Sequence, residues 1–243
     1  MRKDSPYVLV HGAFQSAGTW DLVSARLQAS GRRAINATLT GLGTDASALS
    51  EAVTLDTHIR DVVALLERED FHDVVLVGHS YSGMIITGVA EHARNRIACL
   101  VYIDAFVPEH GQSAMQLLPA SIGDAFRKLA DPNVSWWLRP NDHLLDLWAL
   151  EDGPARAFVK ARLCDFTIRC FEQPLKAPTH AATALARTFI AGVRPSSAAK
   201  AVFEPFAVRA QREGWPYHEL PTGHDPQAEM PDAVTELLLK AAV

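Results

Sequence analysis

The sequence predicts an α/β fold, in which a doubly wound and mostly parallel sheet carries an inserted helical lid. Three observations indicate this fold: continuous apolar runs recur along the chain, amphipathic helical patterns lie between them, and one long segment interrupts the alternation. At 243 residues the chain is long enough to bury a full core. We therefore expect a single domain over residues 1–243.

The apolar runs have the composition of parallel strands that are covered on both faces. They lie at residues 7–10, 74–77, 97–103 and 188–193, and they are continuous instead of alternating with polar residues. A shorter segment, residues 216–220, is expected to form the last strand. The alternation of these strands with helical patterns favours an open, doubly wound sheet.

Two apolar stripes at helical spacing support this alternation. The stripe from Leu55 to Leu66 predicts a helix over residues 54–69. The same spacing predicts a C-terminal helix over residues 230–241, with Pro231 in its first turn, where proline is tolerated.

Residues 107–186 break this rhythm. The segment is rich in Trp, Leu, Phe and Pro, and it shows short helical patches without strands. We expect it to form a helical cap that enters and leaves the sheet through strand ends. A second independent domain is the alternative.

Composition excludes several classes of partner. The net charge of −5 and the absence of a Lys/Arg cluster give no electrostatic basis for binding nucleic acid or an anionic membrane. No apolar stretch reaches the roughly 18 residues that span a bilayer, and the first residues lead directly into a strand, so a cytoplasmic protein is expected.

Cys99, Cys164 and Cys170 show no CxxC spacing, and the ten histidines form no HExxH motif. Neither a disulfide framework nor a metal site is expected.

Ser80 lies in a sequence typical of a nucleophile elbow. Residues 75–83 read Val-Leu-Val-Gly-His-Ser-Tyr-Ser-Gly, which places one serine between an apolar run and a predicted helix. A sharp strand-to-helix turn would expose the hydroxyl near the amides of the helix N-terminus. Ser82 stands where glycine is usual, so Gly83 is expected to provide part of the close approach. The alternative is a buried or capping serine.

A candidate oxyanion-binding turn follows the first predicted strand. Acyl transfer needs two N–H donors directed at the oxyanion, and the glycine of His11-Gly12-Ala13-Phe14 lets the backbone turn its amides inward. The candidate donors are the amides of Tyr81 and of Ala13 or Phe14. An ordinary turn that needs glycine is the alternative.

His224 is the candidate general base. It lies in Gly223-His224-Asp225, directly after the last predicted strand, where a sheet of this kind presents its functional groups. It also comes last in the order serine, acid, histidine. His218, inside that strand, is the alternative base.

The acid that would orient the histidine is Asp104. The strand at 188–193 continues into Arg194-Pro195-Ser196-Ser197 without a carboxylate. Asp104 ends the strand 97–103, which should lie about 4.8 Å from the strand that leads to Ser80, so both residues would emerge at one edge of the sheet. Glu204, another acid, or a dyad without an acid are the alternatives, and Asp104 could instead cap a turn or hold the lid.

Together these motifs resemble the α/β-hydrolase superfamily. More narrowly, the chain is similar to the branch of plant methyl-ester hydrolases, hydroxynitrile lyases and bacterial esterases akin to pyrethroid and carbamate hydrolases. The resemblance implies a Ser-His-acid site under a helical cap, without a cofactor. Lipases of this superfamily that use the earlier strand end are the precedent for Asp104. The matching segments are residues 11–12, 38–43, 55–59, 78–83, 100–108 and 223–224.

Two positions separate hydrolase from lyase within that branch. The similar lyases carry a threonine one place after the first-strand histidine and a lysine just after the catalytic histidine. Here those positions hold Gly12 and Asp225. An anion beside the site would repel cyanide, so the resemblance favours a hydrolase.

We therefore expect a serine hydrolase that cleaves a carboxylic ester, carbamate or amide of a small apolar or aromatic molecule through an acyl-enzyme on Ser80. A non-catalytic ligand receptor of the same fold is the alternative, and the oligomeric state is left open. The candidate substrate-binding residues are Gly12, Phe106, Trp136, Trp137 and Trp148, with further walls from Met115, Leu117, Leu118, Leu144 and Leu147.

Overall fold

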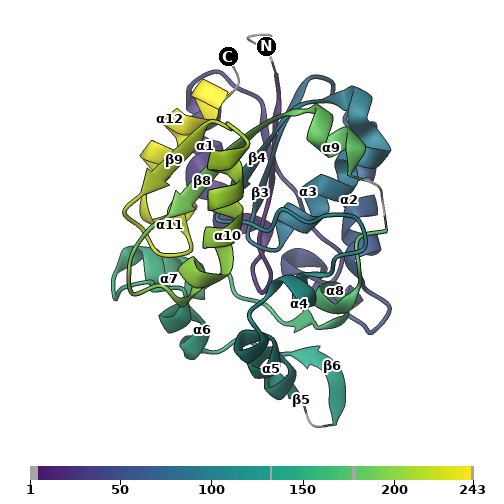
Figure 1. Ribbon diagram of the computed structural model, residues 1–243, viewed down its shortest axis with the longest axis vertical. Helices are drawn as coiled ribbons and strands as arrows, with labels where there is room; N and C mark the ends of the chain where they lie inside the picture. The colour runs from purple at the N-terminus through teal and green to yellow at the C-terminus, as the bar shows by residue number, and fades with distance from the viewer. Residues whose placement is uncertain (1–4, 132, 177–178, 242–243) are drawn as a thin grey trace.

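Six strands form one parallel sheet in the computed structural model, which describes residues 5–131, 133–176 and 179–241 (Figure 1). The strand order is β2-β1-β3-β4-β8-β9, and every pairing in this sheet is parallel. The doubly wound α/β fold is thereby confirmed. Residues 1–4, on which the expected absence of a signal peptide depends, lie outside the described residues.

The five predicted strands are confirmed to within two residues at either end. A sixth, β2 (Ala34–Asn36), was not predicted, because three residues give no periodic signal. The confirmed strands are β1 (Tyr7–Val10), β3 (Val74–His79), β4 (Ile97–Ile103), β8 (Ala186–Gly192) and β9 (Tyr217–Leu220).

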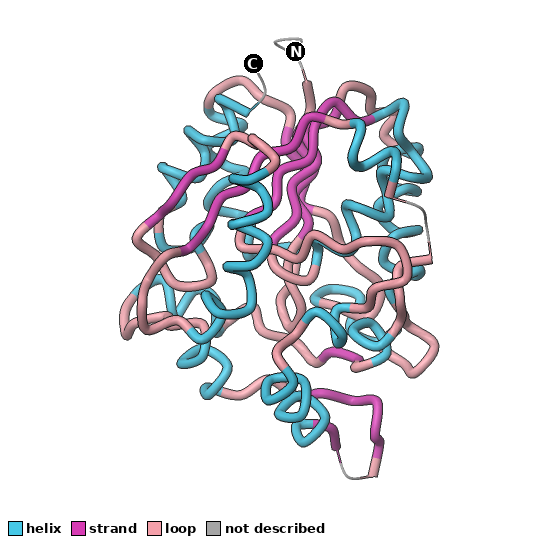
Figure 2. The backbone as a smooth tube through the Cα atoms, in the orientation of Figure 1, coloured by secondary structure: helices cyan, strands magenta, loops and turns pink. Residues whose placement is uncertain are grey.

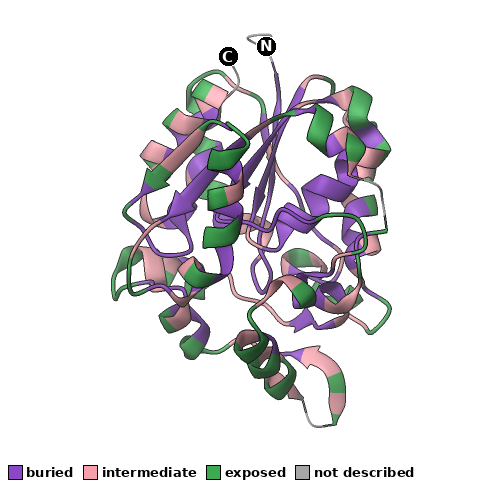
Figure 3. Ribbon diagram, in the orientation of Figure 1, coloured by how far each residue is buried: buried purple, intermediate pink, exposed green. Residues whose placement is uncertain are grey.

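Helices cover both faces of the sheet, which explains why the strand sequences are continuously apolar (Figure 2). Val75 and Val77 belong to one hydrophobic cluster together with residues of α1 (Asp21–Ala29) and α12 (Pro231–Ala241). Val74 and Leu76 belong to a second cluster on the other face. The helices of that face are α2 (Leu55–Arg68), α3 (Ser82–Ala93) and α10 (Ala198–Arg212). Figure 3 shows the strands as the most thoroughly buried part of the molecule.

Both predicted helices are confirmed. Thr54 precedes α2 and forms a capping box with Thr57, so the helix begins where its apolar stripe begins. Pro231 occupies the first position of α12, as expected. A single turn of helix, α11 (Pro226–Glu229), joins β9 to α12, and short 3₁₀ segments lie at Ala17–Trp20, Gly43–Ala48 and Arg94–Arg96.

Most of the segment between β4 and β8, which we call the insertion, lies beyond the carboxyl ends of the strands, and its last helix returns to lie beside α3 (Figure 1). Its helices are short, and its three strands form a separate antiparallel sheet in the order β5-β6-β7. Its elements are α4 (Ala114–Leu117), α5 (Ala120–Leu129), β5 (Ala130–Asp131), β6 (Val134–Leu138), α6 (Asp142–Leu147), α7 (Pro154–Lys160), β7 (Phe166–Thr167), α8 (Arg169–Glu172) and α9 (His180–Ala184).

The prediction of a segment without strands was wrong. Val134–Leu138 combines a β-branched residue with two tryptophans, which fit a pleated and partly buried surface. Its neighbours in the small sheet have only two residues each, too few to show a period of two. Pro132 and Pro178, two of the prolines of this segment, lie outside the described residues.

In the part of the chain that the structure describes, no helix combines the length and the apolar composition that crossing a bilayer requires.

Candidate active site

Ser80 lies on the sharp turn between β3 and α3. Its backbone is in the left-handed region, with φ of 57°, and glycines on both sides make the turn possible. A Cβ on Gly78 would lie 2.8 Å from the Ser82 carbonyl oxygen, and one on Gly83 would lie 1.9 Å from the Phe106 carbonyl oxygen. Gly83 therefore provides the close approach, as expected.

The side chain of Ser82 explains why serine is accepted in place of the usual glycine. The residue is fully buried, and its hydroxyl donates a hydrogen bond to the carbonyl oxygen of His11. This bond joins the elbow to the loop after β1, because His11 follows that strand directly. The substitution thus satisfies a buried acceptor instead of crowding the turn.

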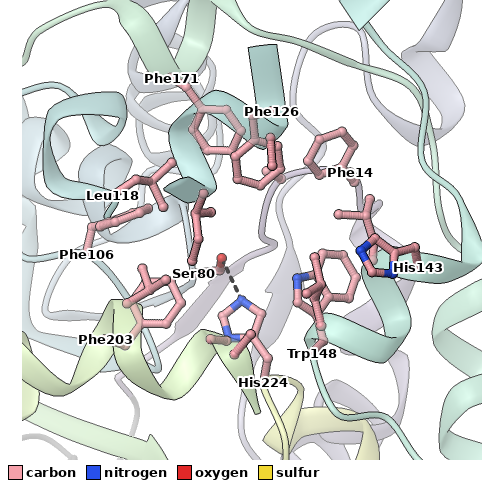
Figure 4. Close-up of a pocket in the computed structure, with 18 of the residues that line it drawn as sticks. Phe14, Ser80, Phe106, Leu118, Phe126, His143, Trp148, Phe171, Phe203 and His224 are labelled. Atoms are coloured by element: carbon pink, nitrogen blue, oxygen red, sulfur yellow. Dashed lines mark hydrogen bonds between the residues drawn. The ribbon is translucent and has the colours of Figure 1, made fainter. Parts of the chain in front are cut away.

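Ser80, His224 and Asp104 form a continuous hydrogen-bonded chain. The Nε2 atom of His224 lies 2.9 Å from Ser80 Oγ (Figure 4), and its Nδ1 atom lies 2.6 Å from Asp104 Oδ2. With a neutral imidazole, Nδ1–H donates to the carboxylate and Nε2 accepts the serine proton. Three residues from three separate strand ends thus meet in the geometry of a nucleophile, a base and an orienting acid.

Asp104 reaches His224 because β3 and β4 are parallel neighbours. His79 pairs with Ile103 in their register, so Ser80 and Asp104 leave the sheet side by side. The Asp104 carboxylate is buried and also accepts a hydrogen bond from the backbone amide of Gly192. Glu204 lies on α10 and His218 lies inside β9, and neither has a hydrogen bond to Ser80 or His224 among the described residues.

Burial controls the charge of the imidazole. His224 is 3% exposed, and burial lowers its pKa from 6.5 to about 3. The ring is therefore neutral at neutral pH, which is the form that can accept a proton from Ser80. The ring of Phe203 stacks on it, with the centroids 4.9 Å apart and the planes 6° from parallel. This contact holds the ring from the side that faces α10.

Ser80 and His224 open into an apolar cavity of about 290 Å³ between the sheet and the insertion (Figure 4). Aromatic and aliphatic side chains form most of its wall, and the few other polar groups include His143. The lining residues are Ala13, Phe14, Ser80, Phe106, Leu118, Ser121, Ile122, Ala125, Phe126, His143, Leu144, Leu147, Trp148, Phe171, Ala198, Ala199, Val202, Phe203 and His224.

Comparison with known proteins assigns the chain to a family. A model of the α/β hydrolase family matches residues 7–237. A carbendazim hydrolyzing esterase of Nocardioides sp. (strain SG-4G) is 36% identical, over 96% of this chain and 97% of its own length. The chain belongs to the α/β-hydrolase family.

Solved structures of other α/β hydrolases share the fold of this hydrolase. An extracellular α/β-hydrolase from a Paenibacillus species superimposes with a TM-score of 0.82 at 24% identity, covering 98% of both chains. A pyrethroid hydrolase from Sphingobium faniae JZ-2 gives a TM-score of 0.77 at 22% identity, covering 99% of this chain and 98% of its own. The predicted family is confirmed, and the chain is a carboxylic ester hydrolase of the α/β-hydrolase type.

The hydrolase brings some of the predicted pocket residues together and not others. Phe106 and Trp148 line the cavity, whereas Trp136 and Trp137 do not. The two tryptophans lie on β6 and stack on each other, with centroids 6.1 Å apart. Of the further predicted walls, Leu118, Leu144 and Leu147 line the cavity, and Met115 and Leu117 do not.

Gly12 supports the elbow of the hydrolase instead of lining the cavity. A Cβ at this position would lie 3.0 Å from both His79 Nδ1 and Ser80 Cβ, a tight contact, so a larger residue would require its neighbours to shift. The two residues that follow do line the cavity, and Phe14 has a left-handed backbone with φ of 62°. Tyr81, the other candidate donor, directly precedes the first residue of α3.

The expectation that Asp225 places an anion beside a bound substrate was wrong. Asp225 does not line the cavity; it is fully buried behind it, where Gln15 and Gln227 donate hydrogen bonds to its Oδ1 atom. Its charge therefore does not face a substrate. The other differences expected from the resemblance, a glycine at position 12 and the lack of a lysine after His224, do not depend on this geometry.

Sequence reasoning missed the walls that α5, α8 and α10 contribute to the cavity of the hydrolase. Phe126, Phe171 and Phe203 come from these three helices, which are far apart in the chain. Their apolar character was visible, but each looks like an ordinary core residue. Only the packing of the insertion against α10 shows that they face Ser80.

The described ranges contain no group of three or more His, Cys, Asp or Glu side chains that could hold a metal ion. The three cysteines are unpaired: Cys99 and Cys170 are buried, and Cys164 is partly buried. Burial raises the pKa of the Cys170 thiol above its ordinary value, which keeps it protonated as a packing residue.

Proposed function

We propose that Ser80 is the nucleophile of the hydrolase. Its Oγ attacks the carbonyl carbon of the substrate while His224 Nε2 takes the hydroxyl proton, and the imidazolium then gives that proton to the leaving alcohol. Water attacks the resulting acyl-enzyme with His224 again as the base, which releases the acid and regenerates Ser80. The 2.9 Å contact between Ser80 and His224, open to the cavity, is the observation that carries this proposal.

Asp104 completes the proposed catalytic triad. Its 2.6 Å contact fixes the imidazole so that Nε2 points at Ser80, and its charge would stabilise the imidazolium that forms in each step. The position of Asp104 at the end of β4, next to the strand that carries Ser80, supports this role.

The proposed oxyanion hole consists of the amides of Tyr81 and of Phe14 or Ala13. Tyr81 stands at the N-terminus of α3, where the helix dipole adds to the effect of the amide. Ala13 and Phe14 line the cavity opposite this helix, and the left-handed backbone of Phe14 turns the loop sharply at this point.

The proposed substrate is a carboxylic ester with a small apolar, preferably aromatic, acyl or alcohol group. Phe14, Phe126 and Phe171 form one contiguous aromatic wall, with neighbouring centroids 5.1 to 6.4 Å apart, against which a planar ring would pack. Carbamates and amides would use the same groups. The insertion would act as the cap that keeps water from the bound substrate.

Covalent labelling tests the proposed function. We expect the wild-type protein to hydrolyse p-nitrophenyl acetate and to be labelled at Ser80 by a fluorophosphonate probe, and Ser80→Ala to lose at least about 10⁴-fold in kcat while folding normally. A wild-type protein that binds apolar esters tightly but is neither labelled nor active would instead be a ligand receptor.

A further inference from the structure

Four polar side chains are buried behind Ser80 and His224, and the proposed reaction uses none of them. Gln15, His79, Asp225 and Gln227 are each at most 1% exposed. Burying a polar group costs free energy unless it is hydrogen bonded, so such a cluster requires a reason. It lies outside the lining of the cavity, which means that it does not touch substrate.

Each of three cluster members is the chain neighbour of a group in the proposed reaction. Gln15 follows Phe14, His79 precedes Ser80, and Asp225 follows His224. They come from three different strand ends: the loop after β1, the last residue of β3 and the loop after β9. The fourth member, Gln227, lies in α11, two residues beyond Asp225.

Hydrogen bonds join these loops in one chain. Asp225 Oδ1 accepts from Gln15 Nε2 at 2.5 Å and from Gln227 Nε2 at 2.9 Å. The same Gln227 nitrogen lies 3.4 Å from His79 Nδ1, and His79 Nε2 lies 2.6 Å from the carbonyl oxygen of His224.

The bond to the His224 carbonyl determines the tautomer of His79. A carbonyl oxygen can only accept, so His79 Nε2 carries the proton and Nδ1 is left with a lone pair that accepts from Gln227. Burial holds the pKa of His79 well below 6.5, which keeps the ring in this neutral form. His79, which directly precedes Ser80, thus holds the main chain of His224.

We infer that Asp225 is a positioning residue: it joins Gln15, Gln227 and, through them, His79 into a network that sets the distance between Ser80, His224 and the oxyanion-binding loop. The inference rests on the proposed function of that site. Misplacing a reacting group by about 1 Å can cost about a hundredfold in rate. The network therefore acts on the chemical step, not on substrate binding.

The structure indicates which substitution preserves the network. Asp225 Oδ1 accepts both glutamine amides, whereas Asp225 Oδ2 and the side-chain oxygens of Gln15 and Gln227 have no hydrogen-bond partner among the residues that the structure describes. Asparagine keeps an acceptor at the position of Oδ1. Alanine removes the acceptor.

The experiment compares kcat and KM for p-nitrophenyl acetate among four variants. We expect Asp225→Ala to lower kcat about tenfold to a hundredfold with KM within about threefold, and Asp225→Asn to retain kcat within about threefold. Gln227→Met, which fills the same volume without donating, should lower kcat similarly. The double variant Asp225→Ala/Gln227→Met should lose much less than the two single losses combined, because both break one network.

Thr235→Val is the matched control. Thr235 is also buried, and its hydroxyl donates to the Pro231 carbonyl at 2.7 Å, in the neighbouring α12 and outside the network. Its loss should lower the temperature of unfolding and leave kcat unchanged. Folding of every variant is checked by circular dichroism and thermal unfolding.

Three outcomes would overturn the inference: wild-type kcat in Asp225→Ala, an equal loss in Asp225→Asn and Asp225→Ala, or fully additive single losses. Fluorophosphonate labelling separates this failure from failure of the proposed function. If Ser80 of the wild type is labelled and Asp225→Ala is labelled at the same rate, only the network is wrong. If the wild type is not labelled, the proposed function itself is wrong.

Discussion

Phe14, Ser80 and Asp104 have left-handed backbones, with φ of 62°, 57° and 42°. A non-glycine residue in this region costs on the order of 1–3 kcal/mol, and it persists only where the surrounding structure enforces it. Each of the three has a separate proposed role, as oxyanion donor, nucleophile and acid. The strained residues at the ends of β1, β3 and β4 therefore coincide with the groups that have to be presented at one edge of the sheet.

Asp104→Asn tests the proposed acid. Asparagine adopts a left-handed backbone readily, so the fold should be retained. An amide cannot stabilise the imidazolium and favours the wrong tautomer of His224, so we expect kcat for p-nitrophenyl acetate to fall by up to about 10⁴-fold. Glu204→Gln, the control for the alternative acid, should stay within about twofold. Activity of Asp104→Asn within twofold of wild type would remove Asp104 from the mechanism.

A second cavity makes a rescue experiment possible. It measures about 190 Å³, lies behind Asp104, and is lined also by Gly192, Glu204 and Tyr217. Asp104→Gly would extend this cavity to the His224 ring, where a small carboxylate could take the place of the lost side chain. We expect formate to restore kcat of Asp104→Gly in a concentration-dependent way, and to leave Ser80→Ala inactive.

The residues of the site differ in how far sequence could identify them. Ser80 and His224 stand in local motifs, and Asp104 followed from the rule that neighbouring parallel strands end at one edge. Phe126 and Phe203 have no such signal, because their place in the cavity depends on how the insertion packs. Trp136 and Trp137 were predicted to line the cavity only because tryptophan is a large apolar residue. Two tryptophans that stack on each other on β6 look the same in the sequence.

At the scale of elements, Arg194 follows β8, at the place where the sequence has no carboxylate to orient His224. Its Nη1 atom donates to the Ala149 carbonyl at 2.6 Å and lies 2.7 Å from Glu229 Oε2, while Glu229 Oε1 accepts from the Gly223 amide at 2.7 Å. This ion pair connects the insertion, the end of β8 and the loop that carries His224. The backbone of His224 is held from the same direction, since its amide donates to the Trp148 carbonyl at 2.9 Å.

Arg194→Met should therefore destabilise the protein and loosen the loop of His224. The arginine and glutamate side chains are 18% and 11% exposed, so the unpaired carboxylate would be largely buried, and we expect a loss of about 1–3 kcal/mol in the free energy of unfolding. Arg209→Met is the control variant. It breaks an ion pair at the C-terminal end of α10, in which Arg209 Nε also lies 2.7 Å from its partner, Glu213 Oε1. It should cost stability without lowering kcat, whereas Arg194→Met should lower both. Equal kcat in the two variants would contradict a role for Arg194 in holding the loop.

The elements that sequence predicted best are those whose burial is simplest. Strands of the main sheet are covered on both faces, so the ends of their apolar runs predicted the ends of the strands closely. In α2 and α12 one face is buried, so an apolar stripe at helical spacing predicted each helix. The insertion buries its elements only partly and against one another, which leaves no clean period for β5, β6 and β7.

At the scale of the whole molecule, folding buries histidines in the neutral state. Burial lowers the pKa of both His11 and His58 to about 4 and that of His79 well below 6.5. Burial also raises the pKa of Asp225 to about 7. The pair of His224 and Asp104 adds nothing to the balance. Burial raises the pKa of Asp104 well above 3.8, so in acid the folded pair holds one proton on this carboxyl, and the unfolded pair holds one on the imidazole.

Stability should consequently fall as the pH drops below about 6.5. In the unfolded chain the three histidines become protonated near pH 6.5, but in the folded protein they stay neutral, so unfolding takes up about three protons. Asp225 has the opposite sign, since the folded protein holds its proton and the unfolded chain releases it. The net uptake of about two protons predicts a loss of about 2.7 kcal/mol per pH unit between pH 6 and 5. Urea unfolding at several pH values measures this slope.

His58→Gln isolates one of these protons. The ring of His58 lies 3.0 Å from the Thr40 carbonyl oxygen, and the glutamine amide can donate to the same oxygen, so the hydrogen bond need not be lost. Without this histidine the uptake falls by about one proton, and the slope between pH 6 and 5 should decrease by about 1.4 kcal/mol per pH unit. A wild-type stability that does not change across this range would contradict the burial of neutral histidines. An unchanged slope in His58→Gln would contradict the assignment to His58.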